Sequence, residues 1–128
     1  MCANLTVEPR TPRQSFMDLE IALDLERLEA DIAILGLPYG DPYSIDEVSN
    51  DQSNAPTAIR RASRCASDCL ECWDFDLGGP LLADKPIRVV NCGDVPGNQH
   101  DLGQHYRHAE RVVRQILSAG VMPHCYGC

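Results

Sequence analysis

The sequence predicts an α/β fold in three layers, with a small parallel sheet between helices. Two compact apolar runs have the composition of buried strands: "DIAILGL" at 31–37 and "IRVVNCGD" at 87–94. Each is followed by a helical pattern, and a third run, "VMPHCYG", begins at residue 121. Strands that alternate with helices favour parallel pairing, because each helix carries the chain back to the start of the next strand.

Composition excludes several classes of protein. A chain of 128 residues fits one domain. Its net charge of -8, from 19 acidic and 11 basic side chains, repels phosphate backbones, so we expect no nucleic-acid partner. We also expect no membrane partner, since no apolar run reaches the roughly 20 residues that a membrane span needs. The N-terminus lacks the pattern of a secretory signal, so we expect a cytoplasmic protein with reduced cysteines.

The first half of the chain divides into four segments. Residues 1–14 contain two prolines and no periodicity, which predicts an irregular arm preceding a domain at 15–128. Leucines and isoleucine among acidic residues at 18–30 suggest a helix. The strand at 31–37 is closed by Gly36 and Pro38. The Pro-, Gly- and Asn-rich segment 38–56 predicts a long loop.

The second half predicts two helices, a connector and two strands. Pro56 can occupy the first turn of a helix that extends to Leu70 with small and apolar residues at helical spacing. Residues 73–86 are rich in turn-forming residues and form a connector with at most a short extended piece. A helix at 99–119 follows the second strand and ends before Gly120. Its predicted apolar face comprises Leu102, Tyr106, Ala109, Val113, Ile116 and Leu117.

Three cysteines are the most chemically suggestive pattern. Cys65, Cys69 and Cys72 form a C-x3-C-x2-C motif, the spacing that holds a 4Fe-4S cluster in radical S-adenosylmethionine enzymes. Here the cysteines fall within a helical repeat, where steps of four and three place the sulfurs on one face. We therefore interpret them as small packing residues. An iron–sulfur protein is kept as a less favoured alternative.

The remaining candidate ligands form weaker patterns. His105 and His108 share a helical face near Glu110, with His100 just before the helix, but a metal site needs three or four converging ligands. Asp74 and Asp76 could pair in an extended segment, although simple solvation is the plainer interpretation. Cys125 and Cys128 form a C-x2-C pair without the helix of a thioredoxin-like motif. A structural zinc is not favoured.

Five segments in order carry a resemblance to a known family. These are "ADIAILGLPYG", "SNAPTAIRRAS", "DFDLGGPLL", "VVNCGDV" and "ILSAGVMP", between residues 30 and 123. Together they resemble the N-terminal third of the ureohydrolases, the arginase and agmatinase family, and look closest to bacterial agmatinase-like members. The resemblance implies a three-layer α/β/α fold with a parallel sheet, truncated to the first three strands of the arginase-like fold.

The resemblance assigns structural roles to a small set of residues. Gly36 and Pro38 match the end of the family's first strand, and Pro56, Ile59 and Arg60 match its Gly-Pro-x-Ala-Ile-Arg helix start, with Ala55 in place of Gly. Gly93 and Asp94 match its Gly-Asp after the second strand, where the carboxylate can cap backbone amides of the turn. We expect no catalytic, cofactor-binding or metal-ligating residue in this sequence.

The family's chemistry is hydrolysis of a guanidino compound to an amine and urea, with two manganese ions that activate a bridging water. In the family the third strand leads into a Gly-Gly-Asp-His signature that supplies the first ligand. Here "AGVMP" is followed by "HCYGC", so Gly127 matches the first Gly and Cys128 replaces the second.

These differences lead to two expectations. The first is a truncated N-terminal fragment that binds no manganese and is inactive by itself. The alternative is a non-catalytic interaction fragment that associates with itself through an exposed sheet edge.

Overall fold

The computed structural model describes residues 14–38, 54–82, 85–96 and 101–127. The predicted N-terminal arm, most of the predicted loop at 38–56, His100 and Cys128 lie outside these ranges, so those predictions stay predictions. Within the described ranges, no helix is long and apolar enough to cross a membrane.

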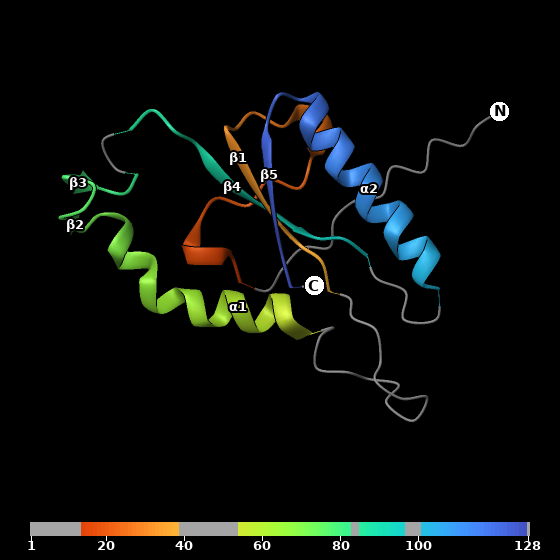
Figure 1. Ribbon diagram of the computed structural model, residues 1–128, viewed down its shortest axis with the longest axis horizontal. Helices are drawn as coiled ribbons and strands as arrows, with labels where there is room; N and C mark the ends of the chain where they lie inside the picture. The colour runs from red at the N-terminus through yellow and green to blue at the C-terminus, as the bar shows by residue number, and fades with distance from the viewer. Residues whose placement is uncertain (1–13, 39–53, 83–84, 97–100, 128) are drawn as a thin grey trace.

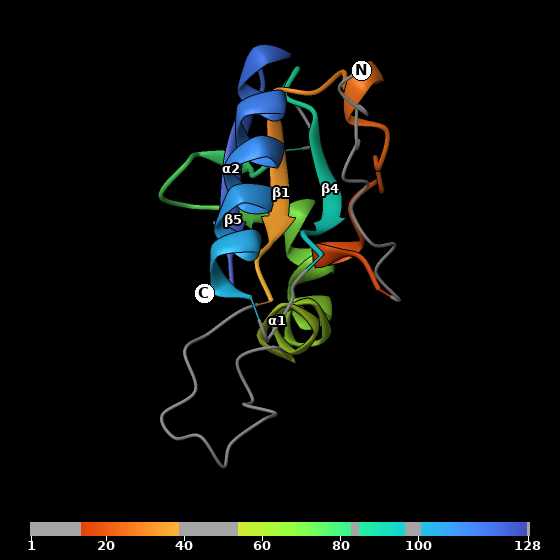
Figure 2. The ribbon, with the colours of Figure 1, turned by 90° about the vertical axis from the view of Figure 1, so that its right-hand side faces the viewer.

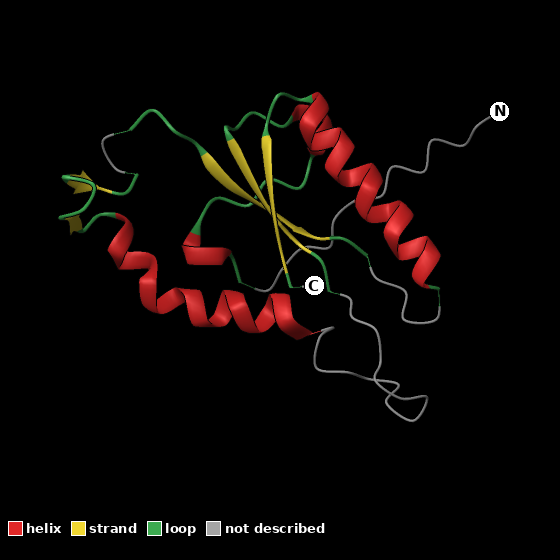
Figure 3. Ribbon diagram, in the orientation of Figure 1, coloured by secondary structure: helices red, strands yellow, loops and turns green. Residues whose placement is uncertain are grey.

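A three-stranded parallel sheet forms the centre of the molecule (Figures 1 and 3). Its strands are β1 (Ile32–Gly36), β4 (Val89–Asp94) and β5 (Met122–Tyr126), in the order β4-β1-β5. All three predicted strands are confirmed, and so is the α/β fold class. β1 is central and buried almost throughout, which is why its sequence reads as a continuous apolar run rather than an alternating one.

The hydrophobic core lies between one face of the sheet and helix α2 (Leu102–Ser118), which runs alongside the strands in Figure 2. Alternate residues of a strand point to the same face. Ala33 and Leu35 of β1 therefore share this face, where they join Val112 and Ile116 of α2 in one buried cluster. Val90 and Cys92 of β4 and Leu25 and Leu28 of the preceding segment belong to the same cluster.

Helix α2 confirms the predicted helix, and its predicted apolar face is confirmed in part, because Ile116 is buried and Ala109 and Val113 pack against the core. Asp101 caps its N-terminus, with Oδ1 accepting a hydrogen bond from Gln104 N at 2.8 Å. The residues buried along α2 are His105, Val112 and Ile116. Two members of the predicted apolar face are largely exposed, Tyr106 at 60% and Leu117 at 55%. The pattern therefore located part of the face and missed His105, because a buried histidine gives no apolar signal.

The helix predicted at 18–30 is wrong. This segment forms two short 3-10 turns, η1 (Phe16–Asp18) and η2 (Leu25–Arg27), joined by extended chain. Between them, Ala22 N donates to Asn91 O at 2.9 Å and Asn91 N donates to Glu20 O at 2.8 Å, so the chain pairs in parallel with β4 at Ile21. Leucine or isoleucine occupies every second position from 19 to 25, and a period of two is typical of extended chain.

The first crossover helix begins as predicted but changes from an α-helix to a 3-10 helix. Helix α1 (Ala55–Ser63) has Pro56 in its first turn and continues as the 3-10 helix η4 (Arg64–Leu70). Ser63 Oγ donates to Arg60 O and Ser67 Oγ donates to Arg64 O, both at 2.8 Å. Serine hydroxyls that bond carbonyls of the preceding turn compete with the α-helical ladder, which accounts for the tighter continuation.

A short antiparallel hairpin confirms the predicted connector. Strands β2 (Trp73–Asp74) and β3 (Gly79–Pro80) pair at its base and lie at the far end of η4, away from the main sheet (Figure 1). Asp74 Oδ1 accepts hydrogen bonds from Asp76 N at 2.8 Å and Leu77 N at 3.0 Å. Asp74 therefore stabilises the hairpin turn, which is a structural role.

Candidate functional site

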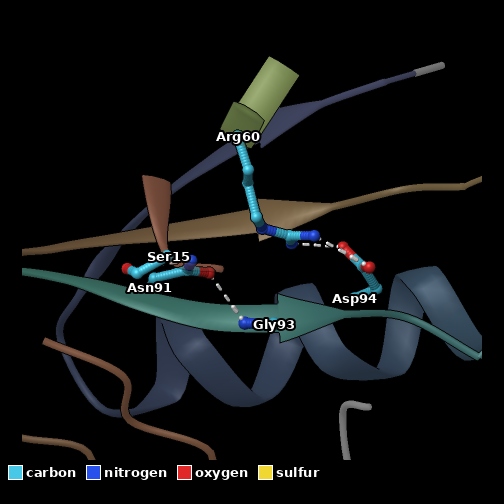
Figure 4. Close-up of polar contacts among 5 residues, drawn as sticks. All are labelled: Ser15, Arg60, Asn91, Gly93 and Asp94. Atoms are coloured by element: carbon cyan, nitrogen blue, oxygen red, sulfur yellow. Dashed lines mark hydrogen bonds and ion pairs between the residues drawn. The ribbon is translucent and has the colours of Figure 1, made fainter. Parts of the chain in front are cut away.

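The candidate site lies at the carboxyl ends of the strands. In open α/β sheets, ligands bind just beyond these ends, where the strand order reverses direction. Here the chain passes from central β1 to β4 on one side and then to β5 on the other, so the reversal occurs beside β1. At this edge Gly36, Asp94 and Tyr126 end the three strands, and Arg60 reaches them from α1 (Figure 4 for Arg60 and Asp94).

A buried ion pair between Arg60 and Asp94 is the centre of the site. Arg60 Nη1 donates to Asp94 Oδ2 at 3.0 Å, and Nη2 donates to Oδ1 in a second, parallel contact. The Arg60 side chain is only 2% exposed and that of Asp94 16%. Arginine is suited to this position because its planar guanidinium matches a carboxylate with two hydrogen bonds. The pair joins α1 to the end of β4 across β1.

A bulge in β4 directs Asp94 toward Arg60. Ile34 is in register with Asn91, but Gly36 is in register with Asp94, so β4 contains one extra residue in this interval. Gly93 adopts φ of +77°, a conformation that side chains disfavour. The bulge turns Asp94 onto the face that α1 occupies. Asn91 supports it, because its buried Oδ1 accepts a hydrogen bond from Gly93 N at 2.9 Å (Figure 4).

Gly36 provides the space that the ion pair occupies. A Cβ atom at this position would lie 1.9 Å from Asp94 Oδ1 and 3.0 Å from Arg60 Nη2. No L side chain fits there without displacing the carboxylate. Glycine is therefore required at the end of β1 because the Asp94 carboxylate approaches Gly36 closely, and not because of the backbone angles of Gly36.

Tyr126 closes the cluster from β5. The Arg60 guanidinium carbon lies 5.4 Å from the centre of the Tyr126 ring, and Phe16 contacts the same ring at 5.8 Å. The first is a cation–π contact, which adds to the ion pair. Burial raises the pKa of Tyr126 to about 12. The nearby Arg60 charge lowers this pKa, but its effect is smaller than that of burial. The phenol is therefore neutral at physiological pH.

The sequence-predicted residues assemble only in part. Gly36, Arg60, Gly93 and Asp94 come together in one cluster. Pro56 lies beside it, because a Cβ on Gly127 would be 2.6 Å from Pro56 Cγ. Ile59 and Pro38 are half-buried, and their predicted structural roles stay predictions. The Asp94 carboxylate is bound by Arg60 through both oxygens. The prediction that it also caps backbone amides stays a prediction, because residues 97–100 of the following turn lie outside the described ranges.

Sequence reasoning missed two members of the cluster, Tyr126 and Asn91. Tyr126 was considered only as part of a polar strand end, and Asn91 as one residue in a buried strand. The one available signal was the polar side chain of Asn91 within an otherwise apolar run, which indicates a specific hydrogen-bonding role.

The three-cysteine motif does not form the buried face that we predicted. Cys65, Cys69 and Cys72 are all exposed, so the interpretation as packing residues is wrong. No residue of η4 is buried, so no face of this segment packs against the core.

His105 is a core residue. Only 3% of it is exposed, and burial is the main cause that lowers its pKa, followed by the charge of His108. A hydrogen bond with the backbone of Pro96 acts in the opposite direction. A buried neutral imidazole bonded to the backbone is a structural element of α2. In the part of the chain that the structure describes, no three His, Cys, Asp or Glu side chains are close enough to hold a metal ion.

Comparison with protein families decides how this arrangement is classified. Residues 30–127 match the Arginase family. The chain belongs to the Arginase family. The matched region begins just before β1 and ends just after β5, so it contains the whole sheet, both crossover connections and the Arg60–Asp94 pair. A search of curated proteins found no match.

Arginase-family proteins are ureohydrolases and are generally manganese-dependent. The described residues of this chain do not fit a manganese site, because manganese prefers several converging carboxylate and imidazole ligands. Asp94, the carboxylate nearest the strand ends, is engaged by Arg60 through both oxygens. We therefore assign the cluster a structural role.

The first prediction concerns the ion pair. Asp94→Ala leaves a buried guanidinium without its partner, which costs about 3–5 kcal/mol in the free energy of unfolding. Glu110→Ala is the matched control, because it breaks an exposed pair with Arg114 within one helix and costs about 0.5 kcal/mol or less. Urea unfolding followed by circular dichroism measures both. Equal losses for the two variants would contradict the assigned role.

The second prediction concerns the space at Gly36. Gly36→Ala forces Asp94 away from Arg60, and overpacking of this kind costs about 1–3 kcal/mol. Gly79→Ala is the control, since nothing lies within 4 Å of the added carbon. The same unfolding measurement applies. A Gly36→Ala protein as stable as the control would show that the carboxylate moves aside at no cost.

Proposed function

We propose that this chain provides the N-terminal α/β part of an agmatinase-like, manganese-dependent ureohydrolase that converts a guanidino compound to an amine and urea. The observation that carries the proposal is the match of residues 30–127 to the Arginase family. The agmatinase subtype is supported by the five ordered segments between residues 30 and 123, which look closest to bacterial agmatinase-like proteins.

The role of these residues in such an enzyme is to position the end of β5. In the family, the segment that resembles "AGVMP" leads toward the first metal-binding signature. Tyr126 at the end of β5 packs against Arg60, and Tyr126 O accepts a hydrogen bond from Leu37 N at 2.9 Å. Gly127 packs on Pro56 at the start of α1. The cluster therefore fixes the direction in which the chain leaves the sheet. When bound, manganese supplies an activated water.

These 128 residues on their own are, in this proposal, inactive. The resemblance places the metal ligands in Gly-Gly-Asp-His, Asp-x-His-x-Asp and Asp-x-Asp motifs, and this sequence contains neither of the first two. Its Asp-x-Asp, Asp74-Phe75-Asp76, lies in the β2–β3 hairpin, where Asp74 binds backbone amides of the turn. Most of the rate enhancement of a metallohydrolase comes from its metal-bound nucleophile. The ligands would have to come from outside these residues.

The third prediction tests the proposal with two proteins. The 128-residue chain, purified from a host without ureohydrolases, releases no urea from agmatine in the presence of manganese. A chimera in which residues 30–127 replace the corresponding part of an active agmatinase releases urea, because the scaffold is equivalent.

Two results would contradict the proposal. Urea release by the isolated chain would show that it contains a complete metal site. A chimera that folds and binds manganese, yet hydrolyses arginine in preference to agmatine, would reject the agmatinase subtype. A chimera carrying Glu110→Ala serves as the control, since this exposed pair lies away from the cluster.

A second candidate function is self-association without catalysis, with a second copy of the chain as the partner. One observation favours it: no described segment pairs with the outer edge of β5, and Met122 on this strand is 66% exposed. An uncovered strand edge with exposed apolar side chains is a template for pairing with another chain. Pro123, which cannot donate a backbone hydrogen bond, limits the extent of such pairing.

The fourth prediction distinguishes this candidate. Light scattering of the purified chain increases with concentration, and Met122→Lys reduces the increase because a charge is placed on the associating strand. Leu117→Lys is the control, since it adds the same charge to a side chain of α2 that is 55% exposed. A strictly monomeric parent protein, or equal effects of both variants, would reject association through β5.

A further inference from the structure

Two of the three cysteines share one turn, and the third lies apart from them: Cys65 and Cys69 belong to η4, and Cys72 follows just after its end at Leu70. A 3-10 helix has three residues per turn and rises about 2 Å per residue, so positions i and i+3 lie on the same face. Cys69 and Cys72 are three apart and close one turn, with Cys72 N donating to Cys69 O at 3.3 Å. Cys65 is four residues before Cys69, which places it on a different face and about 8 Å away along the axis.

This spacing meets the geometric condition for a disulfide at Cys69 and Cys72. A hydrogen-bonded four-residue turn brings its first and last Cα atoms to within about 7 Å, and disulfides join cysteines whose Cα atoms are about 4.4–6.8 Å apart. The Cys72 thiol points back along the helix, since Sγ donates to Asp68 O at 3.3 Å. The thiol group therefore lies over the turn that contains Cys69.

Both thiols are accessible to reagents in solution. Cys69 and Cys72 are exposed, and so are Glu71 between them and Trp73 after them. The turn lies at the end of η4 and leads directly into the β2–β3 hairpin, away from the main sheet (Figure 1). Oxidation at this turn therefore requires no rearrangement of the core.

We propose that Cys69 and Cys72 form a reversible dithiol–disulfide site whose oxidant is a low-molecular-weight disulfide such as oxidised glutathione. The thiolate of one cysteine attacks a sulfur of the small disulfide, which forms a mixed disulfide and releases one small thiol. The thiolate of the other cysteine then attacks the protein sulfur of that mixed disulfide and releases the second small thiol. The protons of the two cysteines end on the two released thiols, so atoms and electrons balance.

The disulfide is expected to be easily reduced. A bond between cysteines three apart closes a very short loop, so it restricts the unfolded chain little and gains little stability from that restriction. Its exposure also leaves both sulfurs open to attack by reducing thiols. These properties are those of a switchable modification rather than a structural cross-link.

The fifth prediction uses Trp73 as a local reporter. It is the only tryptophan of the chain, and it follows Cys72 directly. Incubation of the folded, full 128-residue protein with oxidised glutathione links Cys69 to Cys72, as read by peptide mapping after the free thiols are alkylated. Trp73 emission falls, because a disulfide next to an indole quenches it, and dithiothreitol restores the emission.

Two variants and one internal control make the test specific. Cys65→Ser keeps both the link and the change in emission, whereas Cys69→Ser loses both. Cys92 remains unmodified in the native protein, because it is fully buried in β4 and its pKa is raised to about 11 by burial. Cys65 and Cys69 are exposed, so neither substitution disturbs the core; far-UV circular dichroism verifies this.

Two outcomes would overturn the inference. In the first, glutathione stays attached to Cys69 and Cys72 as stable mixed disulfides in the parent protein. This would mean that neither cysteine can attack the mixed disulfide on the other. The other is a link from Cys65 to Cys69 that forms in preference, because this would mean that the segment is α-helical in solution. Both are read from the same peptide map of the parent protein.

Discussion

The burial of one cation, Arg60, is the constraint on which the rest of this structure depends. Its side chain crosses from α1 over the end of β1 and reaches Asp94 on β4, while Tyr126 on β5 packs against its guanidinium. A charge removed from water in this way is tolerated only with a partner of matching geometry. Because the partner is on a different element, the ion pair fixes where α1 lies relative to all three strands.

Two glycines and one amide make this arrangement possible. Gly93 bends β4 into the bulge that turns Asp94 to the correct face, Asn91 holds the bulge, and Gly36 leaves room for the carboxylate. Asn91 also connects the bulge to the preceding segment, because its Nδ2 donates to Ser15 Oγ at 3.2 Å. The two faces of the sheet therefore differ in character: α2 covers an apolar core, and α1 covers a polar network.

The helix that carries Arg60 also leads to the cysteine turn. Within α1 and η4, serine hydroxyls tighten the backbone after Arg60, and the resulting 3-10 geometry separates Cys65 from Cys69 and Cys72. Ser63 additionally accepts a hydrogen bond from Met17 N at 2.8 Å, which anchors this transition to η1. The match to the Arginase family covers both parts of this connection, Arg60 and the cysteine turn. Arg60 is buried against the strand ends, whereas the cysteine turn is exposed.

Local pattern predicted the three strands and the two crossover connections, because buried parallel strands are continuous apolar runs and strand–helix alternation favours parallel pairing. The resemblance to a known family, and not the local pattern, indicated the motif positions Gly36, Arg60, Gly93 and Asp94. The strand order β4-β1-β5 was not predicted. Tertiary structure alone decided which residues those motifs contact. Arg60 and Asp94 are 34 positions apart, and the bulge that joins them arises from pairing between β1 and β4. The chain around Ile21 is extended because Asn91 provides its backbone partners, and the cysteines are exposed because no face of η4 packs against the core. These outcomes depend on long-range hydrogen bonds and on competition between backbone geometries, which the spacing of residues along a chain does not encode.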